Sequence, residues 1–244
     1  MLTKVRERYS RQILFSEIGE KGQEKLRKST VAIVGVGALG TVAAELLIRA
    51  GVENLILIDF DKVELSNLQR QALFTEKDIG KNKALAAKKR LHEINSLAKI
   101  KVFTGKLEDK VSILSQANLV LGCTDHLTSR FLINHYCLKH KIPWIFASAV
   151  RSSGYVMPVL PNHPCLRCFV KKDIKLDTAG TIGILNTLTY SIPALQVTLA
   201  LKILLGYKVE PLLYYYDVWH QDFRKIKVKK NAKCEGCGKV NRKN

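Results

Sequence analysis

The chain has 244 residues, 47% of them hydrophobic, which suffices for one large domain or two small ones with a packed core. Its formal net charge is +19, and the stretch from Arg224 to the end holds nine Lys or Arg and one Glu, or +8. A surface this basic attracts nucleic acid, nucleotides, acidic proteins or anionic lipid, or it is simply a solvated Lys-rich surface.

Short apolar strands alternate with helices through the first 150 residues. The pattern predicts strands over 31–34, 55–59, 101–104, 119–123 and 144–149, and helices over 39–50, 82–94 and 128–140, with a short helix between the third and fourth strands. This alternation predicts an α/β fold with a doubly wound, mainly parallel, Rossmann-like sheet that is covered on both faces.

The pattern changes after residue 150. Residues 154–160 favour an antiparallel strand, in which Pro158 indicates a sheet edge or a bulge. Residues 212–216 predict another strand, and the alternation of apolar residues with Lys over 223–230 is typical of a half-exposed one. We therefore expect one domain over residues 1–244, with a nucleotide-binding half to about 150 and a mixed half from about 151, the sheet being extended by antiparallel strands.

One uncharged stretch is long enough to cross a bilayer. It runs for 24 residues, from Thr178 to Leu201, but contains Asn186, Pro193 and Gln196. We interpret it as a loop followed by a helix from about residue 190 to 205, buried or at a subunit interface, and favour a membrane-spanning helix less.

A glycine-rich turn follows the first strand and opens the first helix. Gly35, Gly37 and Gly40 have the spacing that lets a backbone approach a phosphate, whose charge the helix N-terminus favours. Asp59 ends the second strand and is placed to accept hydrogen bonds from ribose hydroxyls. The pattern predicts a nucleotide site without separating NAD from ATP, and the alternative is a turn that serves packing only.

The residues beyond Asp59 favour a triphosphate. Arg70 and Lys83 place two cations near the nucleotide, where they would reduce the repulsion between an attacking carboxylate and a polyphosphate. Asp125 follows the strand over 119–123 at the carboxyl end of the sheet, where a lone carboxylate suits Mg²⁺. For each residue taken singly, a surface salt bridge is the simpler interpretation.

Four of the six cysteines form two CxxC pairs, Cys165/Cys168 and Cys234/Cys237. The N-terminus has no apolar signal core, so we expect a cytoplasmic protein with reduced thiols, and such pairs favour a structural zinc ion held by four thiolates. The alternatives are two unconnected pairs or a redox pair. Cys123 and Cys137 have no CxxC partner and are expected to be inert core thiols.

Several strings together carry a family resemblance. They are RYSRQILF (Arg8–Phe15), GVGALG, LIDFDKVELSNLQRQ (Leu57–Gln71), CTD (Cys123–Asp125) and the two CxxC pairs. The chain resembles the MoeB/ThiF/HesA family, relatives of ubiquitin-activating enzymes, from about Arg8 to Cys237. The resemblance implies an adenylyltransferase that uses ATP and Mg²⁺ to adenylate the C-terminal glycine of a small ubiquitin-fold sulfur carrier ending in Gly-Gly. It also implies a homodimer whose subunits complete each other's sites.

The resemblance also implies roles for individual residues. Asp59 would hold the ribose, Asp125 would anchor Mg²⁺ and be the residue most needed for chemistry, and Arg11 would reach the phosphates of the neighbouring subunit. Arg130 would contact the incoming carrier tail. The residues that would bind and polarise the phosphates are Asn67, Arg70 and Lys83, with Gln71 in support.

One departure from the family concerns cysteine. Several relatives carry one in the loop after the first CxxC pair, whereas residues 171–186 here have none. We therefore expect the reaction to stop at the acyl-adenylate, with another protein supplying sulfur for molybdopterin, thiamine or tRNA thiolation; the sequence does not select among these. The alternatives are an NAD-dependent oxidoreductase and a non-catalytic relative that binds a carrier or tRNA, tRNA being the less favoured partner because aromatic residues do not interleave with the basic run.

Overall fold

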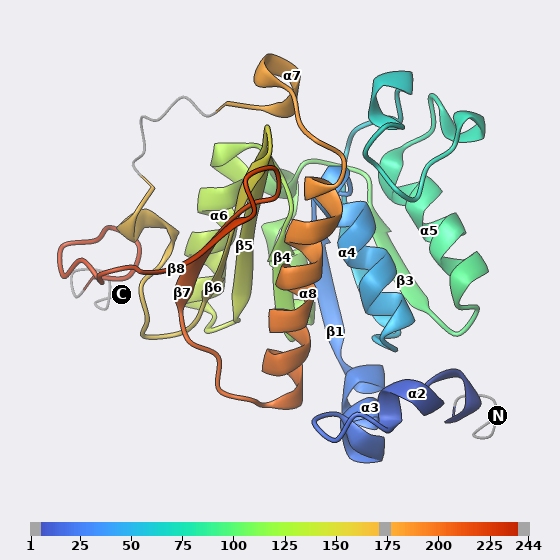
Figure 1. Cartoon of the computed structure of the whole chain (residues 1–244), viewed down its shortest axis with the longest axis horizontal. Coiled ribbons are helices and arrows are strands. Elements are labelled where there is room, and N and C mark those ends of the chain that lie inside the picture. The colour runs from blue at the N-terminus through green and yellow to red at the C-terminus, as the bar shows by residue number, and fades with distance from the viewer. Residues whose placement is uncertain (1–5, 171–176, 239–244) are drawn as a thin grey trace.

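A single eight-stranded sheet forms the centre of the protein in the computed structural model, which describes residues 6–170 and 177–238 (Figure 1). The strand order is β3-β2-β1-β4-β5-β6-β7-β8. The first five strands in this order, β3 to β5, pair in parallel, and β5 to β8 pair antiparallel. The strands are β1 (Thr30–Val34), β2 (Asn54–Ile58), β3 (Lys99–Phe103), β4 (Leu119–Gly122), β5 (Trp144–Val150), β6 (Ser153–Val159), β7 (Leu212–Asp217) and β8 (Asp222–Lys227).

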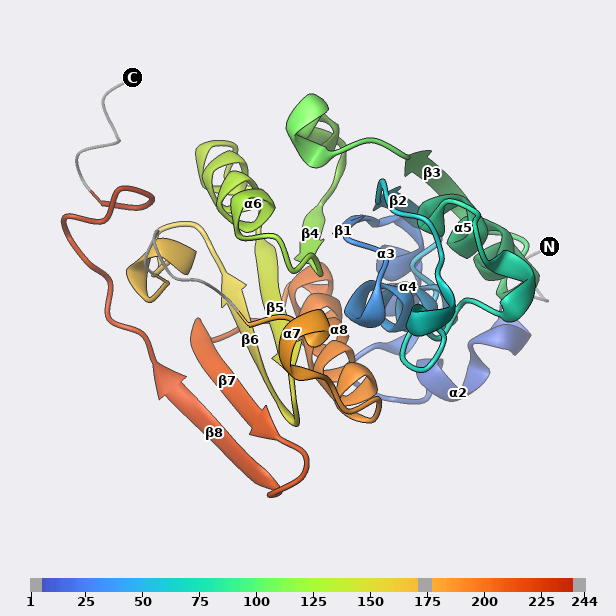
Figure 2. The ribbon, with the colours of Figure 1, turned by 90° about the horizontal axis from the view of Figure 1, so that it is seen from above.

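Helices cover both faces of this sheet (Figure 2). One face packs against α4, α5 and α8, and the other against α6 and two 3-10 segments, η3 and η4. The helical segments are α2 (Ser10–Ile13), α3 (Gly19–Lys28), α4 (Ala38–Arg49), η1 (Leu65–Asn67), η2 (Glu76–Asp78), α5 (Lys83–Ile94), η3 (Leu107–Asp109), η4 (Val111–Gln116), α6 (Leu127–Lys139), η5 (Leu166–Cys168), α7 (Ala179–Ile182) and α8 (Leu188–Leu205). The predicted doubly wound sheet with antiparallel extension is confirmed.

The central strands are apolar throughout because both of their faces are buried. Val31 and Ile33 of β1 face one core cluster, whereas Ala32 and Val34 face the other. All four residues of β4 are buried. A strand with two buried faces cannot alternate polar and apolar residues, which is why these strands read as unbroken apolar runs.

The long apolar helix α8 packs against α4, β5 and β6. It is the one helix among the described residues that is long and apolar enough to cross a membrane, and half of it is buried within the protein. Core helices of soluble proteins pass the same test. The predicted helix therefore exists, and it begins at Leu188 rather than at about 190.

Three local predictions need correction. The segment between β3 and β4 forms two 3-10 segments instead of a short α-helix. The strand with Pro158 is not an edge strand, because β6 pairs with β5 and β7. Pro158 lies where β6 pairs with β5 alone, so one side of this residue is unpaired, as is usual for proline in a sheet. Strand β8 is one of the two edge strands, ends at Lys227 and is mostly exposed rather than half-exposed, with Phe223 48% and Ile226 40% exposed.

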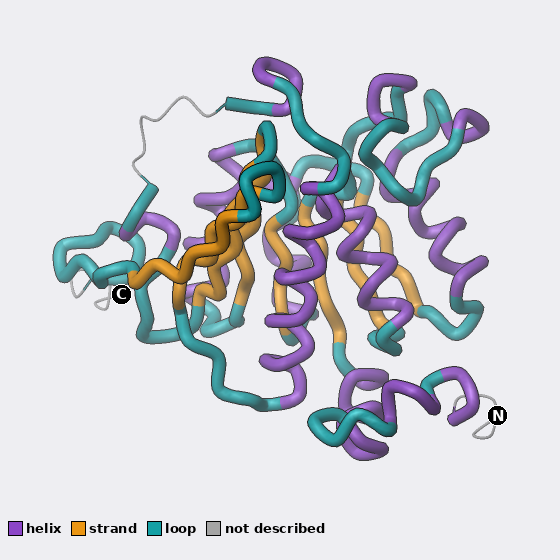
Figure 3. Tube along the Cα trace, in the orientation of Figure 1, coloured by secondary structure: helices purple, strands orange, loops and turns teal. Residues whose placement is uncertain are grey.

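The strand order reverses between β1 and β4. The connections that follow β1 and β4 leave the carboxyl edge of the sheet as loops, teal in Figure 3, and run in opposite directions. A crevice forms at the carboxyl ends of two such strands. Ligands of open α/β sheets bind at such a switch point. The sheet topology therefore places a site directly after Val34 and Gly122.

Candidate active site

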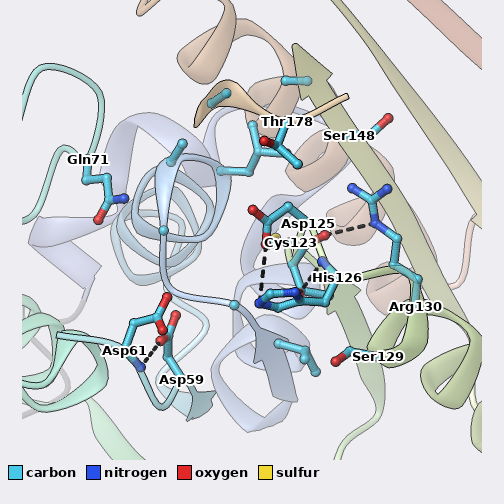
Figure 4. A pocket seen from close by; sticks show the side chains of 18 of the residues that line it. Asp59, Asp61, Gln71, Cys123, Asp125, His126, Ser129, Arg130, Ser148 and Thr178 are labelled. Atoms are coloured by element: carbon cyan, nitrogen blue, oxygen red, sulfur yellow. Dashed lines mark hydrogen bonds and ion pairs between the residues drawn. The ribbon is translucent and has the colours of Figure 1, made fainter. Parts of the chain in front are cut away.

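A cavity of about 470 Å³ lies at this switch point (Figure 4). Its volume is that of a small-molecule site. The predicted site residues that line it are Gly35, Gly37, Asp59, Asn67, Arg70, Gln71, Lys83, Asp125 and Arg130. The fold thus gathers residues from five separate segments of the chain into one cavity.

The glycine turn enters the cavity between β1 and α4. Gly35 has φ of +89°, and a Cβ there would lie 2.8 Å from the backbone nitrogen of Thr124. A Cβ on Gly40 would lie 1.9 Å from the Gly35 carbonyl oxygen, so these two glycines permit close backbone packing. At Gly37 the nearest described atom would be 3.6 Å away, on Gln71, so this glycine instead keeps the cavity open to a ligand.

Asp59 is fixed to the glycine turn by its side chain. One carboxylate oxygen accepts a hydrogen bond from the Val36 N–H at 2.6 Å, and the other accepts one from the Asp61 N–H at 2.8 Å. Burial raises the pKa of Asp59 above its usual value, while the two N–H donors and Lys83 act in the opposite direction. Each carboxylate oxygen retains a further lone pair with which it can accept from a ribose hydroxyl.

Lys83 stands opposite Asp59, at the first position of α5. Its ammonium lies 2.9 Å from a carboxylate oxygen of Asp61, and its side chain is only 10% exposed. Asn82 caps the helix by accepting from the Leu85 N–H, and its amide nitrogen donates to the carbonyls of Asp59 and Asp61. These contacts hold a nearly buried cation beside the cavity.

The segment after η1 supplies amide and guanidinium groups. Asn67 is buried, and its Oδ1 accepts from the Glu64 N–H at 3.2 Å. Arg70 donates to the Ser66 carbonyl at 2.8 Å. The buried Oε1 of Gln71 has no hydrogen-bond partner among the described residues, although Gln71 lines the cavity. This amide oxygen beside the cavity is therefore available to accept a hydrogen bond.

Asp125 and Arg130 follow β4 on the other side of the cavity. Asp125 is exposed, and a carboxylate oxygen lies 3.8 Å from Nε2 of His126. Arg130 is buried; its Nε donates to the Thr124 carbonyl at 2.9 Å and its guanidinium lies 5.2 Å from the centre of the Phe146 ring. Burial lowers the pKa of Arg130 to about 10, partly opposed by Asp125, so it stays cationic at neutral pH.

Arg11 does not line the cavity of its own subunit. It lies on α2, and Figure 1 shows α2 and α3 at the end of the sheet opposite to α7, whose Ala179 lines the cavity. The structure therefore does not bring Arg11 together with the other predicted residues of the same chain. A role in a neighbouring subunit's site stays a prediction, as do the predicted roles of the residues that line the cavity.

Some residues that line the cavity were not predicted from the sequence. Phe60 and His126 stack with ring centres 6.1 Å apart at the cavity, and Asp61 pairs with Lys83. Tyr155 of β6 and Thr178, which precedes α7, also line it. Phe60 and Asp61 stand within the family string and His126 follows Asp125 directly, so proximity to these motifs was the available signal; Tyr155 and Thr178 had none.

The two lone cysteines are buried thiols. Cys123 lines the cavity and is 8% exposed, and Cys137 on α6 is completely buried. Burial raises the pKa of each to about 12, and at neutral pH both are protonated and poorly nucleophilic. The loop after the first CxxC pair lies partly outside the described residues, which resume at Asp177.

The four paired cysteines converge into one cluster, although the two pairs are far apart in the sequence. Their sulfur atoms lie within 4.8 Å of one another, with 3.7 Å between Cys165 and Cys234 and 3.4 Å between Cys168 and Cys237. All four are free thiols. Tetrahedral zinc with Zn–S bonds of about 2.3 Å would hold its sulfurs roughly 3.8 Å apart. The donor set and its spacing therefore fit zinc.

The glycine turn, the carboxylate at the end of β2 and the cavity at the switch point define a nucleotide-binding α/β protein of the Rossmann-like class. A family model described as the ThiF family matches residues 9–236. The chain therefore belongs to the ThiF family, and the predicted family resemblance is confirmed.

Individual relatives agree with this assignment. The Bacillus subtilis protein named sulfur carrier protein ThiS adenylyltransferase is 38% identical over 239 residues, which cover 95% of this chain and 71% of that protein. The Escherichia coli molybdopterin-synthase adenylyltransferase is 36% identical over 238 residues, covering 95% and 96%. A crystal structure of E. coli MccB with ATP is similar, with a TM-score of 0.81 and 25% identity over 95% of this chain and 74% of MccB.

Proposed function

We propose that this chain is an adenylyltransferase that activates the C-terminal glycine of a small ubiquitin-fold sulfur carrier with ATP. The observation that carries the proposal is the convergence of Arg70, Lys83 and Arg130 with Asp59 and Asp125 in one cavity at the switch point. The names of the relatives support the reaction and the kind of substrate. The whole chain serves as one adenylation domain.

The nucleotide binds along the glycine turn. Asp59 accepts hydrogen bonds from the ribose, and the amides at the start of α4 face the phosphates. Arg70 and Lys83, aided by Asn67 and Gln71, neutralise and align the polyphosphate. Asp125 holds Mg²⁺, which in such sites is bound by one or two carboxylates together with phosphate oxygens; its exposed carboxylate leaves room for that ion.

The carrier tail enters from a second cavity of about 310 Å³, which adjoins the first. Arg130, Ser148 and Tyr155 line both cavities, whereas the rest of the second lining is apolar. Among the described residues no carboxylate lies within ion-pair distance of Arg130. A buried cation at this junction suits a terminal carboxylate, which would approach α-phosphorus from the apolar side.

The chemistry needs no covalent nucleophile from the enzyme. A carboxylate oxygen of the terminal glycine attacks the α-phosphorus of ATP, the bond to the bridging oxygen breaks, and pyrophosphate leaves. Alignment and charge neutralisation supply the catalysis. Because the two lone thiols are protonated and buried, the reaction stops at the acyl-adenylate, and another protein supplies the sulfur.

Three further parts complete the proposal. The enzyme is a homodimer in which Arg11 of one subunit reaches the phosphates of the other, and this role accounts for its place far from the cavity of its own chain. A zinc ion bound by the four paired cysteines joins the loops that carry them. Free thiols in this number suit a reducing compartment, so we propose a cytoplasmic location.

The test is carrier-dependent exchange of pyrophosphate into ATP. Candidate carriers are short ubiquitin-fold proteins ending in Gly-Gly that are encoded beside this gene. Exchange should require the carrier and Mg²⁺, and ATP with Mg²⁺ should raise the Tm where NAD does not. A rise in Tm with NAD alone, or no exchange with the carrier that the chain binds, would overturn the proposal.

A further inference from the structure

The side chain of Asn134 connects α6 to the four-cysteine cluster. Asn134 is completely buried, and its Oδ1 accepts a hydrogen bond from the Leu166 N–H at 3.0 Å, between Cys165 and Cys168. This bond fixes the orientation of the side-chain amide, because only the oxygen can accept. The amide nitrogen therefore points away from Leu166.

That nitrogen is buried and has no hydrogen-bond partner among the described residues. Leaving a buried donor unsatisfied is unfavourable, and native structures rarely do so. The position of Gly236 shows what lies nearby: a Cβ added there would meet Cys165 Sγ at 2.9 Å and Asn134 Nδ2 at 3.1 Å. The unpartnered amide and the cysteine sulfur thus border the same small space.

Four thiolates around Zn²⁺ carry a net charge of minus two, and this cluster is largely buried. Such a charge is stable only where N–H groups donate to the sulfurs. One such donor is already in place, since the Gly236 N–H donates to Cys234 Sγ at 3.4 Å. Cys165 is completely buried, and the amide of Asn134 is the unused donor beside it.

We infer that Asn134 donates a hydrogen bond from its side-chain amide to the Cys165 thiolate in the zinc-loaded protein and thereby strengthens metal binding. The inference rests on the proposed zinc ion. It gives Asn134 two tasks, holding the Leu166 backbone through its oxygen and the ligand sulfur through its nitrogen. Arg130 lies one helical turn earlier on α6, so the metal site is tied to the helix that reaches the active site.

Two substitutions separate these tasks. Asn134→Asp keeps an oxygen for the Leu166 N–H but replaces the donor with a negative charge beside the thiolates. Asn134→Ala removes both contacts without adding charge. If the amide donates to sulfur, zinc affinity in chelator competition should fall about 10- to 100-fold in Asn134→Asp, and less in Asn134→Ala. If the side chain only holds Leu166, Asn134→Ala should lose more zinc affinity than Asn134→Asp, and the inference is wrong.

Asn118→Asp is the matched control, because Asn118 also accepts a backbone N–H, from Thr30 at 2.8 Å, but lies in the bend before β4. It should leave zinc affinity unchanged. Metal analysis of the wild type separates two failures: absence of zinc refutes the metal, whereas bound zinc with equal affinity in Asn134→Asp refutes the role of Asn134. If the variants do not fold, NMR of the wild-type protein loaded with a spin-active cadmium isotope tests the inference. Only a hydrogen bond to a ligand sulfur transmits scalar coupling from the metal to the Asn134 amide proton. Absence of this coupling overturns the inference.

Discussion

Replacing Lys83 with Met tests the charge at the cavity while keeping the shape of the side chain. Met retains an unbranched stem in a side-chain position that is only 10% exposed, and it removes the ammonium that lies 2.9 Å from Asp61. Loss of one preorganised charged donor to the developing transition-state charge typically lowers turnover about 100- to 1000-fold, or about 3 to 4 kcal/mol. Carrier-dependent ATP–pyrophosphate exchange at saturating ATP should fall by this factor.

The same substitution should barely change stability. Asp61 is 46% exposed and regains water when its partner is lost, so the ion pair contributes at most about 1 kcal/mol to folding. Lys81→Met is the control, because Lys81 pairs with Asp78 at 3.1 Å on the surface and does not line the cavity. The reasoning is refuted if Lys83→Met keeps its exchange rate within about threefold of wild type, or if Lys81→Met loses as much.

Three other substitutions test separate parts of the site. Gly40→Ala should lower the free energy of unfolding by about 3 kcal/mol and the Tm by roughly 6–12 °C, because the added Cβ would clash with the Gly35 carbonyl oxygen. An unchanged Tm would contradict this close packing of Gly40 against Gly35. Asp125→Asn should abolish Mg²⁺-dependent exchange without changing the Tm, since Asp125 is exposed, and near-wild-type exchange at saturating Mg²⁺ would remove it from the mechanism. Cys123 should resist iodoacetamide at pH 8, because burial raises its thiol pKa to about 12 and the thiolate forms only as the pH nears that value. Cys123→Ala should likewise support carrier thiocarboxylation, whereas loss of that product with exchange intact would make Cys123 a nucleophile.

The parallel half of the fold could be predicted because its physical requirements are local. Strands buried on both faces must be apolar throughout. Helix α4 ends two residues before Gly51, and α5 begins after its cap Asn82. Predicted boundaries there lie within two residues of the observed ones. The sheet edge was less predictable, because exposure depends on which strand pairs last, and Pro158 fits an interior strand once only one side of it is paired.

The candidate site also contains residues that the sequence predicts and residues that it does not. Residues adjacent to the glycine turn and to the ends of β2 and β4 follow from the rule that these ends meet at one edge. Tyr155 and Thr178 could not be found, because only the folding of distant segments brings them to the cavity. The unpaired side-chain nitrogen of Asn134 could not be predicted from the sequence either, because its lack of a hydrogen-bond partner depends on the residues that surround it in the fold.

The two backbone hydrogen bonds to Asp59 have a consequence for recognition. A free carboxylate would sample several rotamers and would have to give up that freedom when a nucleotide arrived. Here the loss of side-chain entropy has already occurred during folding, because the Val36 and Asp61 N–H groups select a single orientation. The sugar of an incoming nucleotide would thus meet an acceptor already pointed at its hydroxyls, and discrimination for a ribose would begin without any rearrangement of the protein.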